Sequence, residues 1–282
     1  MQIRHWLSET LPLLRHSDSA KRDAEVILGH VLNKPRSWLL AFDDYELTPE
    51  QQAMLAKFVE RRAQGEPIAY LCGQREFWSL PLAVSPATLI PRPDTEVLVE
   101  QALSLLPCQP VTVLDLGTGT GAIALAMASE RPESQFLGVD RIEQAVTLAQ
   151  TNAERLAMAN CRFQVSHWFN QIPPSQFDMI VTNPPYIDAD DPHLTQGDVT
   201  FEPRSALVAE AQGLADITLI IQQAPNWLVL GGWLVVEHGW QQHHQVQEIF
   251  AAVGFDAIDT RYDYGGNPRV TYGKFAQASK KL

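Results

Sequence analysis

The sequence predicts an α/β fold with a mostly parallel sheet, preceded by a small all-helical domain and a β-hairpin linker. Apolar residues recur every three or four positions in residues 1–73, which is the spacing of amphipathic helices. Short alternating runs interrupted by prolines fill residues 74–93. Apolar strands then alternate with helical segments through residues 94–282, as in proteins with a parallel sheet.

The first region contains clear helix signals. Trp6 and Leu11 belong to an apolar helical stripe, and Thr48 and Pro49 are followed by Gln51, a combination typical of a capped helix start. We therefore expect residues 1–73 to form a helical bundle. Such a domain in front of an enzyme suggests recognition of a macromolecular substrate, with a stabilising cap as the alternative.

The prolines of residues 74–93 predict a stiff hairpin linker, because proline fixes φ and lacks a backbone donor. After it, helices and strands alternate. The predicted helices span residues 94–106, 121–130, 143–156, 214–229 and 241–253. The predicted strands span residues 111–115, 135–140, 161–165, 177–182, 232–237, 255–261 and 270–275. Ligands of such sheets bind in the loops after the strands.

Charge argues against a nucleic acid partner. The 282 residues include 21 Lys and Arg against 33 Asp and Glu, a formal charge of −12. Residues 1–73 hold 9 basic and 10 acidic side chains, and residues 74–282 hold 12 and 23. The larger region would therefore repel phosphates unless a local basic patch intervened.

Cysteine usage and hydropathy predict a cytoplasmic protein with no membrane association. Cys72, Cys108 and Cys161 form no paired motif, which fits a reducing compartment. The first residues lack the apolar core of a signal peptide. The apolar stretch 214–236 is interrupted by Asp216, Pro225 and a pair of glycines, so it predicts no membrane helix. We expect a monomer.

A glycine-rich loop between a strand and a helix predicts a cofactor site. Glycines at positions 117, 119 and 121 allow a sharp turn and close approach of a ligand. The next strand ends at Asp140, about 20 residues on, where a carboxylate can accept both ribose hydroxyls of an adenosine. The candidate residues are Asp115, Gly117, Thr118, Gly119, Thr120, Gly121 and Asp140.

The glycine spacing alone also fits a dinucleotide site of a dehydrogenase. Asp115 favours S-adenosylmethionine, because a carboxylate beside the loop would repel a pyrophosphate but attract the ammonium group of a methionyl tail.

A second site follows the strand 177–182, in the tetrapeptide Asn183, Pro184, Pro185 and Tyr186. The prolines lack N–H groups, so their carbonyls are left to accept hydrogen bonds in a loop. Asn183 adds an amide, and Tyr186 offers a ring for stacking on a planar group. These residues suit an NH₂ group attached to an sp² system.

Such a nitrogen is a poor nucleophile because its lone pair is delocalised. If the Asn183 side-chain oxygen and the Pro184 carbonyl each accept one N–H, the nitrogen is oriented and made more electron-rich. Asn183 and Pro184 are therefore the catalytic candidates, and no metal or strong base is required. His238, His243 and His244 could suggest a metal site, but we interpret them as surface histidines.

These motifs resemble the HemK/PrmC protein-(glutamine-N5) methyltransferases, and the resemblance extends over nearly the whole chain. The segments that carry it are residues 75–80, 90–96, 115–121, 183–187, 201–203 and 237–239. It implies a Rossmann-like class I methyltransferase domain. It also implies methyl transfer to the glutamine of the Gly-Gly-Gln motif in class 1 peptide chain release factors.

The resemblance also implies roles for single residues. Residues 117–121 and Asp140 would hold S-adenosylmethionine, Trp168 would pack against the adenine, and Asn183 would lie near the donor. Asn183, Pro184, Pro185 and Tyr186 would bind the glutamine. Many methyltransferases place an acidic residue where His167 stands, so the contact to the adenine amino group is open.

Two alternative functions fit the same motifs. A DNA adenine-N6 methyltransferase would use the same acceptor loop, but it needs basic residues to grip a duplex. A module that binds release factors without catalysis is the other, and the intact tetrapeptide argues against it.

Overall fold

The computed structural model describes residues 1–276 and divides the chain into two compact units. The first contains Met1–Gln74 together with Thr195–Phe201. The second begins at Arg75, includes the hairpin that we expected as a linker, and contains the rest of the described chain.

The first unit is helical. Its elements are α1 (Ile3–Thr10), η1 (Leu11–Leu14), α2 (Ala20–Leu32), α3 (Arg36–Ala41), α4 (Pro49–Ala63) and α5 (Ile68–Cys72). Their apolar faces form one buried cluster centred on Ile3, Ile27, Leu28 and Leu55. The helical spacing in the sequence is therefore explained by burial against this common core.

Two polar features define helix α4. Thr48 and Gln51 form the expected capping box, with Thr48 Oγ1 accepting from the Gln51 N–H and Gln51 Oε1 accepting from the Thr48 N–H. Near the other end, Arg62 is mostly buried and forms ion pairs with Asp23 at 2.7 Å and Asp198 at 2.9 Å. Asp198 belongs to η4 (Gly197–Phe201), so Arg62 fixes that turn to the helices.

The second unit opens with a hairpin of β1 (Gln74–Phe77) and β2 (Leu80–Ala83). Its turn residues Trp78 and Ser79 have φ of 53° and 60°, the left-handed conformation that tight hairpins require. Phe77 and Leu82 are buried in the main core, and Asn152 accepts a hydrogen bond from the Ala83 N–H at 2.8 Å. The hairpin is therefore packed onto the sheet domain.

The main sheet has seven strands in the order β5-β4-β3-β6-β7-β9-β8. The strands are β3 (Thr112–Leu116), β4 (Gln135–Asp140), β5 (Cys161–Val165), β6 (Phe177–Thr182), β7 (Leu228–Glu237), β8 (Phe255–Tyr262) and β9 (Pro268–Phe275). The pairs among β3 to β7 are parallel, and β9 pairs antiparallel with both β7 and β8.

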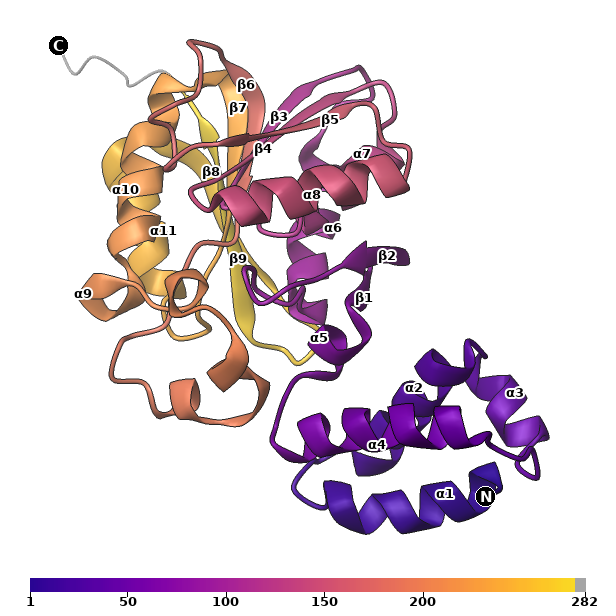
Figure 1. Ribbon diagram of the computed structural model, residues 1–282. Helices are drawn as coiled ribbons and strands as arrows, with labels where there is room; N and C mark the ends of the chain where they lie inside the picture. The colour runs from indigo at the N-terminus through magenta and orange to yellow at the C-terminus, as the bar shows by residue number, and fades with distance from the viewer. Residues whose placement is uncertain (277–282) are drawn as a thin grey trace, which may run out of the picture. The chain divides into compact units, whose positions relative to one another are not determined.

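Helices cover both faces of this sheet, as Figure 1 shows with α6, α7 and α8 on one side and α10 and α11 on the other. They span Glu96–Leu105, Ala122–Glu130, Glu143–Arg155, Ala215–Gln223 and His243–Val253, in that order. Strand residues alternate between the faces: Val113 and Val181 contribute to one core, Leu114 and Ile180 to the other. Both faces are buried, which explains the continuous apolar runs.

One predicted helix is wrong in its extent. We expected a helix over residues 214–229, but α10 ends at Gln223 and a single turn, η6 (Ala224–Asn226), follows. Pro225 cannot donate to a continuing helix, and β7 already begins at Leu228. The longer β7 pairs with β6 from Phe177 onward, so sheet pairing overrides the helical spacing.

The segment between β6 and α10 contains short turns that the sequence pattern did not predict. They are η3 (Pro192–Thr195), η4, η5 (Arg204–Ala206) and α9 (Glu210–Gly213), and η2 (Pro93–Thr95) precedes α6. Within residues 1–276, no helix combines the length and apolar character needed to cross a membrane.

Candidate active site

The site lies between the parallel strands β3 and β6. From β3 the chain adds β4 and β5 on one side of the sheet, and from β6 it adds β7 on the other. The neighbours β3 and β6 pair Leu116 with Thr182 at their carboxyl ends, and Thr182 Oγ1 donates to the Leu116 carbonyl at 2.8 Å. The glycine loop begins directly after Leu116, and the Asn-Pro-Pro-Tyr loop begins directly after Thr182. The two loops that the sequence singled out are therefore side by side, at the switch point of the sheet.

The glycine loop depends on backbone conformations that other residues adopt at a cost. Gly117, Gly119 and Gly121 have φ of 72°, 54° and 82°. The Gly117 and Thr118 N–H groups both donate to the Val139 carbonyl at 2.9 Å, which ties the loop to the end of β4. Gly121 then caps the start of α7. The loop presents backbone to the cavity because no side chain intervenes at these positions.

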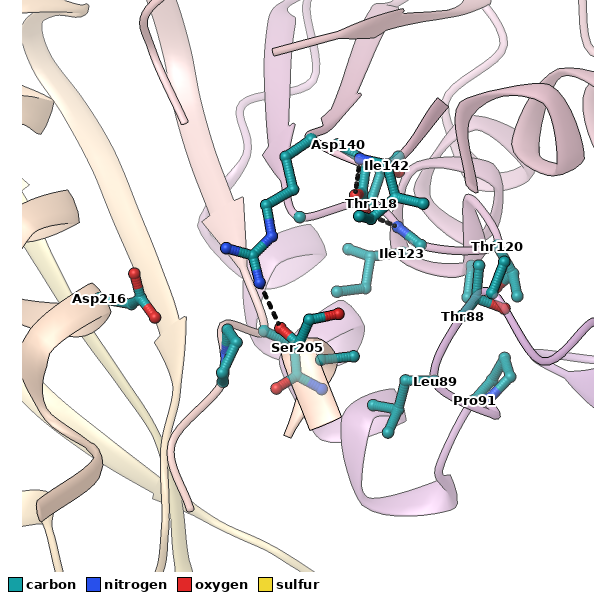
Figure 2. A pocket seen from close by; sticks show the side chains of 18 of the residues that line it. Thr88, Leu89, Pro91, Thr118, Thr120, Ile123, Asp140, Ile142, Ser205 and Asp216 are labelled. Carbon is teal, nitrogen blue, oxygen red and sulfur yellow. Dashed lines mark hydrogen bonds between the residues drawn. The ribbon is translucent and has the colours of Figure 1, made fainter. Parts of the chain in front are cut away.

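Asp140 is held by the same loop. Its Oδ2 accepts from the Gly119 N–H at 3.0 Å and its Oδ1 from the Ile142 N–H at 2.9 Å. Figure 2 shows this carboxylate beside Thr118 at the cavity wall. Burial raises the Asp140 pKa, while these backbone donors oppose the rise. Each oxygen keeps a lone pair that can accept a hydroxyl.

Asp115 lies beneath the loop and is not part of the cavity wall. Its side chain is 1% exposed, and Oδ2 accepts from the Thr118 hydroxyl at 2.6 Å. Burial raises the Asp115 pKa to about 7. In this arrangement Asp115 shapes the glycine loop from within, so the expected direct contact with a methionyl ammonium group stays a prediction.

The cavity brings together most of the residues selected from the sequence. Its wall includes Gly117, Thr118, Gly119, Thr120, Asp140, Trp168, Asn183 and Pro185. The predicted residues that lie outside the wall are Asp115, Gly121, Pro184 and Tyr186. Pro184 is buried and Tyr186 half-buried, so their predicted contacts with the acceptor stay predictions.

The opposite wall comes from the segment between the hairpin and α6, for which no role in the site was expected. Thr88, Leu89 and Pro91 line it, as Figure 2 shows. Arg92 also lines the cavity and pairs with Glu202, whose Oε2 accepts from the Ile90 N–H at 3.0 Å. The signal for this wall was present in the matching segments 90–96 and 201–203, but nothing in the spacing showed that they meet.

Trp168 lines the cavity together with a carboxylate from α10, Asp216. The indole lies against Gly117, and its Nε1 donates to Asp216 Oδ1 at 3.1 Å. Asp216 and His167 both line the cavity. The sequence indicated Asp216 only as an interruption of an apolar stretch, yet the fold places its carboxylate on the cavity wall beside Trp168.

A further bridge crosses the cavity from β4 to η5. Arg141, next to Asp140, donates from Nη2 to the Ser205 carbonyl at 3.1 Å, and both residues line the wall. This bond is drawn in Figure 2.

The Asn-Pro-Pro-Tyr loop is supported by side chains from other elements. Asn183 Nδ2 donates to the Thr95 Oγ1 at 3.2 Å, and the Tyr186 hydroxyl donates to Glu237 Oε1 at 3.2 Å. Gln242 Nε2 donates to the Tyr186 carbonyl at 3.1 Å. These contacts hold both ends of the tetrapeptide from behind.

Gly213 makes the close packing behind this loop possible. It has φ of 81°, and a Cβ at this position would lie 2.0 Å from the Tyr186 carbonyl oxygen. A larger residue is therefore excluded by contact as well as by conformation.

The histidines near the end of β7 do not behave as one group. His238, expected at the surface, is fully buried, with Nδ1 at 2.9 Å from the Gly239 carbonyl and Nε2 at 2.8 Å from Thr271 Oγ1. Burial lowers the His238 pKa to about 4. In the described part of the chain, no group of three His, Cys, Asp or Glu side chains is placed to hold a metal ion.

Comparison with known proteins gives consistent matches. Residues 3–73 match the PrmC N-terminal domain, and residues 109–264 match a methyltransferase domain. The release factor glutamine methyltransferase of Salmonella typhimurium is 58% identical over 275 residues, 98% of this chain and 99% of the relative. The chain belongs to the release factor glutamine methyltransferase family.

Other comparisons agree. The release factor glutamine methyltransferase of Escherichia coli K12 is 56% identical over 277 residues, covering 98% of this chain and 100% of its own. A crystal structure of a methyltransferase from Pyrococcus furiosus superposes with a TM-score of 0.55 at 16% identity, over 79% of this chain and all of the other. That likeness shows the fold, which is the class I methyltransferase fold.

The enzyme is an S-adenosylmethionine-dependent methyltransferase of this family. The cavity suits that cofactor on structural grounds. Asp140 has lone pairs left for two ribose hydroxyls, Trp168 offers a flat apolar surface, and the loop at Gly117 and Gly119 has no side chain to obstruct a methionyl group.

Proposed function

We propose that this enzyme transfers a methyl group from S-adenosylmethionine to the side-chain amide nitrogen, N5, of the glutamine in the Gly-Gly-Gln motif of class 1 peptide chain release factors. The observation that carries the proposal is the position of Asn183 and Pro185 on the wall of the cavity that also contains Gly117 and Asp140. The relatives from Salmonella typhimurium and Escherichia coli are named for glutamine methylation in release factors.

The chain's own groups act on the acceptor. Asn183 uses Nδ2 to donate to Thr95, so Oδ1 is its remaining acceptor. In the proposed complex, Asn183 Oδ1 and the Pro184 carbonyl each accept one N–H of the glutamine amide. The two bonds orient the nitrogen and increase its electron density, which partly restores the lone pair that amide resonance withdraws.

S-adenosylmethionine supplies an electrophilic methyl group on a sulfonium sulfur. During transfer the sulfur–carbon bond breaks and a nitrogen–carbon bond forms. The amide nitrogen then carries an excess proton, which is acidic and leaves to water. Asn183 and Pro184 accept hydrogen bonds throughout and need not take up that proton, so a strong general base is unnecessary.

We assign recognition of the release factor to the helical unit, residues 1–73, which matches the PrmC N-terminal domain. Its charge is nearly balanced, with 9 basic and 10 acidic side chains, whereas residues 74–282 have 12 and 23. A DNA adenine acceptor is not favoured, because the catalytic region lacks an excess of cations. We expect the enzyme to act in the cytoplasm as a monomer, without nucleic acid.

The test compares methyl transfer from labelled S-adenosylmethionine to a class 1 release factor and to its Gln→Ala variant at the Gly-Gly-Gln motif. We expect label in the native release factor and none in the variant. Equal labelling of the two proteins would contradict the substrate assignment. A duplex DNA in a parallel reaction is expected to stay unlabelled.

A further inference from the structure

A buried carboxylate stands behind the acceptor loop, at the end of β7. Glu237 is 1% exposed, and its Oε1 accepts from the Tyr186 hydroxyl at 3.2 Å. Its Oε2 is also buried and has no partner in good hydrogen-bond geometry within residues 1–276. The Thr95 hydroxyl is among the groups that lower the Glu237 pKa, so it lies near this carboxylate.

Thr95 connects this carboxylate to the acceptor site. Its Oγ1 accepts from Asn183 Nδ2 at 3.2 Å, and Thr95 lines the cavity with Asn183. A hydroxyl has one proton to donate. An ionised carboxylate can only accept, so a Thr95 hydroxyl that turns its proton towards Glu237 presents a lone pair to Asn183.

This order of donors and acceptors decides which way the Asn183 amide faces. With a lone pair at Thr95, Asn183 must turn its NH₂ group towards Thr95 and keep Oδ1 for a ligand. The reverse orientation would place an NH₂ group where the acceptor amide brings its own N–H. Tyr186, bonded to the same carboxylate, fixes the other end of the tetrapeptide.

We propose that Glu237 is a positioning residue for methyl transfer, which sets the orientation of the Asn183 amide through Thr95 and holds the loop through Tyr186. This rests on the proposed function of Asn183 as the acceptor of a glutamine N–H. Glu237 does not line the cavity, so its effect is expected in the rate of transfer and not in cofactor affinity.

The protonation state of Glu237 offers a second readout. Burial raises its pKa to about 7, and the charges that face it are Arg269, which opposes the rise, and Asp94, which adds to it. Protonated Glu237 can itself donate a hydrogen bond. The Thr95 and Tyr186 hydroxyls then need not donate to it, and the orientation of the Asn183 amide is no longer determined. Transfer should therefore weaken as the pH falls below about 7.

The experiment measures single-turnover methyl transfer to a release factor by the full-length enzyme, together with cofactor affinity. Glu237→Gln is expected to slow transfer about 10- to 100-fold, with the dissociation constant of S-adenosylmethionine changed less than about threefold. In this variant, the fall in the transfer rate below about pH 7 that is expected for the native enzyme should disappear. Unchanged transfer, or a retained fall below about pH 7 in Glu237→Gln, would overturn the proposal.

Thr95 provides a matched pair should Glu237→Gln fail to fold. Thr95→Val keeps the shape but removes the hydroxyl, and Thr95→Ser keeps the hydroxyl. We expect Thr95→Val to slow methyl transfer about 10-fold or more, and Thr95→Ser to transfer at a rate close to that of the native enzyme. Equal losses in both variants would contradict the relay. Combining Glu237→Gln with Thr95→Val should give much less than the product of the single effects, whereas independent effects would count against coupling.

A readout without release factor separates this proposal from the proposed function. In the free enzyme, NMR of the Asn183 side-chain amide should show proton resonances that shift with pH near 7, and Glu237→Gln should remove the shift. A pH-independent amide in the native enzyme would overturn the relay. Absence of methylation by the native enzyme would instead contradict the proposed function.

Discussion

Two loops leave neighbouring parallel strands and line one cavity, yet they are built in opposite ways. The glycine loop after β3 is shaped by its own backbone, with positive φ at Gly117, Gly119 and Gly121. The Asn-Pro-Pro-Tyr loop after β6 is held by side chains from α6, β7 and α11 and their flanks. The cofactor side of the cavity is therefore local in sequence, and the acceptor side is assembled from distant segments.

The buried carboxylates behind the loops show the same contrast. Asp115 bonds to Thr118, three residues further along the chain. Glu237 bonds to Tyr186, which is 51 residues away. Burial raises the pKa of both carboxylates to about 7. Asp115 stabilises a turn within its own loop, whereas Glu237 stabilises a contact between distant segments.

The largest expected effect is on the acceptor side. Asn183→Ala removes one oriented acceptor and should raise the barrier to transfer by about 2 to 4 kcal/mol. Single-turnover rates at saturating cofactor measure this. Near-normal transfer with retained cofactor affinity would reject the role of Asn183.

Gly213→Ala tests whether the acceptor loop depends on its distant support. The new Cβ would meet the Tyr186 carbonyl oxygen at 2.0 Å, so the loop must move. We expect transfer to fall at least about 10-fold, or roughly 1.4 kcal/mol, with a smaller effect on cofactor affinity. Gly254→Ala is the control, because Gly254 also has a positive φ, of 95°, but no atom within 4 Å of the added Cβ. Equal losses in the two variants would show that backbone strain alone is responsible.

The two carboxylates predict how stability depends on pH. Their pKa values are raised in the folded state to about 7, from 3.8 for Asp115 and 4.5 for Glu237. Each contribution is therefore fully present below the unfolded pKa and is lost as the pH rises through about 7. We expect the free energy of unfolding to fall by about 2 to 3 kcal/mol per group between pH 5 and 8. Denaturant unfolding of Asp115→Asn and Glu237→Gln should each show a flatter profile, and native-like profiles in both would contradict the assignment.

The smallest expected effect is on the cofactor side. Asp140→Asn puts an NH₂ group against one of two backbone N–H groups, from Gly119 and Ile142. Cofactor affinity should fall by about 1 to 1.5 kcal/mol, with little change in transfer at saturation. Calorimetric titration checks this, with the exposed Asp256→Asn as control. If Asp140→Asn lowered only the transfer rate, this would contradict the assignment of cofactor binding to the glycine loop and of transfer to the Asn-Pro-Pro-Tyr loop.

The same contrast explains what the sequence could predict. The order of strands and helices, the capping box at Thr48 and the glycine loop follow from spacing and local backbone chemistry. The helix predicted over 214–229 was wrong because pairing of β7 with β6 outweighs helical spacing. His238 is buried against Thr271 because β7 pairs with β9, and no local sequence pattern predicts that pairing.

The candidate site divides in the same way. The positions of Asn183 and Asp140 on one cavity follow from strand ends that meet at the switch point. The contributions of Asp216, which lines the cavity, and of Glu202, which pairs with the lining residue Arg92, do not, because both depend on tertiary packing.

The most direct test of the account is a single turnover with labelled S-adenosylmethionine and an intact class 1 release factor, followed by peptide mapping of the product. We predict one methyl group, on the side-chain nitrogen of the glutamine in the Gly-Gly-Gln motif. A label on any other residue, or no transfer by an enzyme that binds the cofactor, would contradict it.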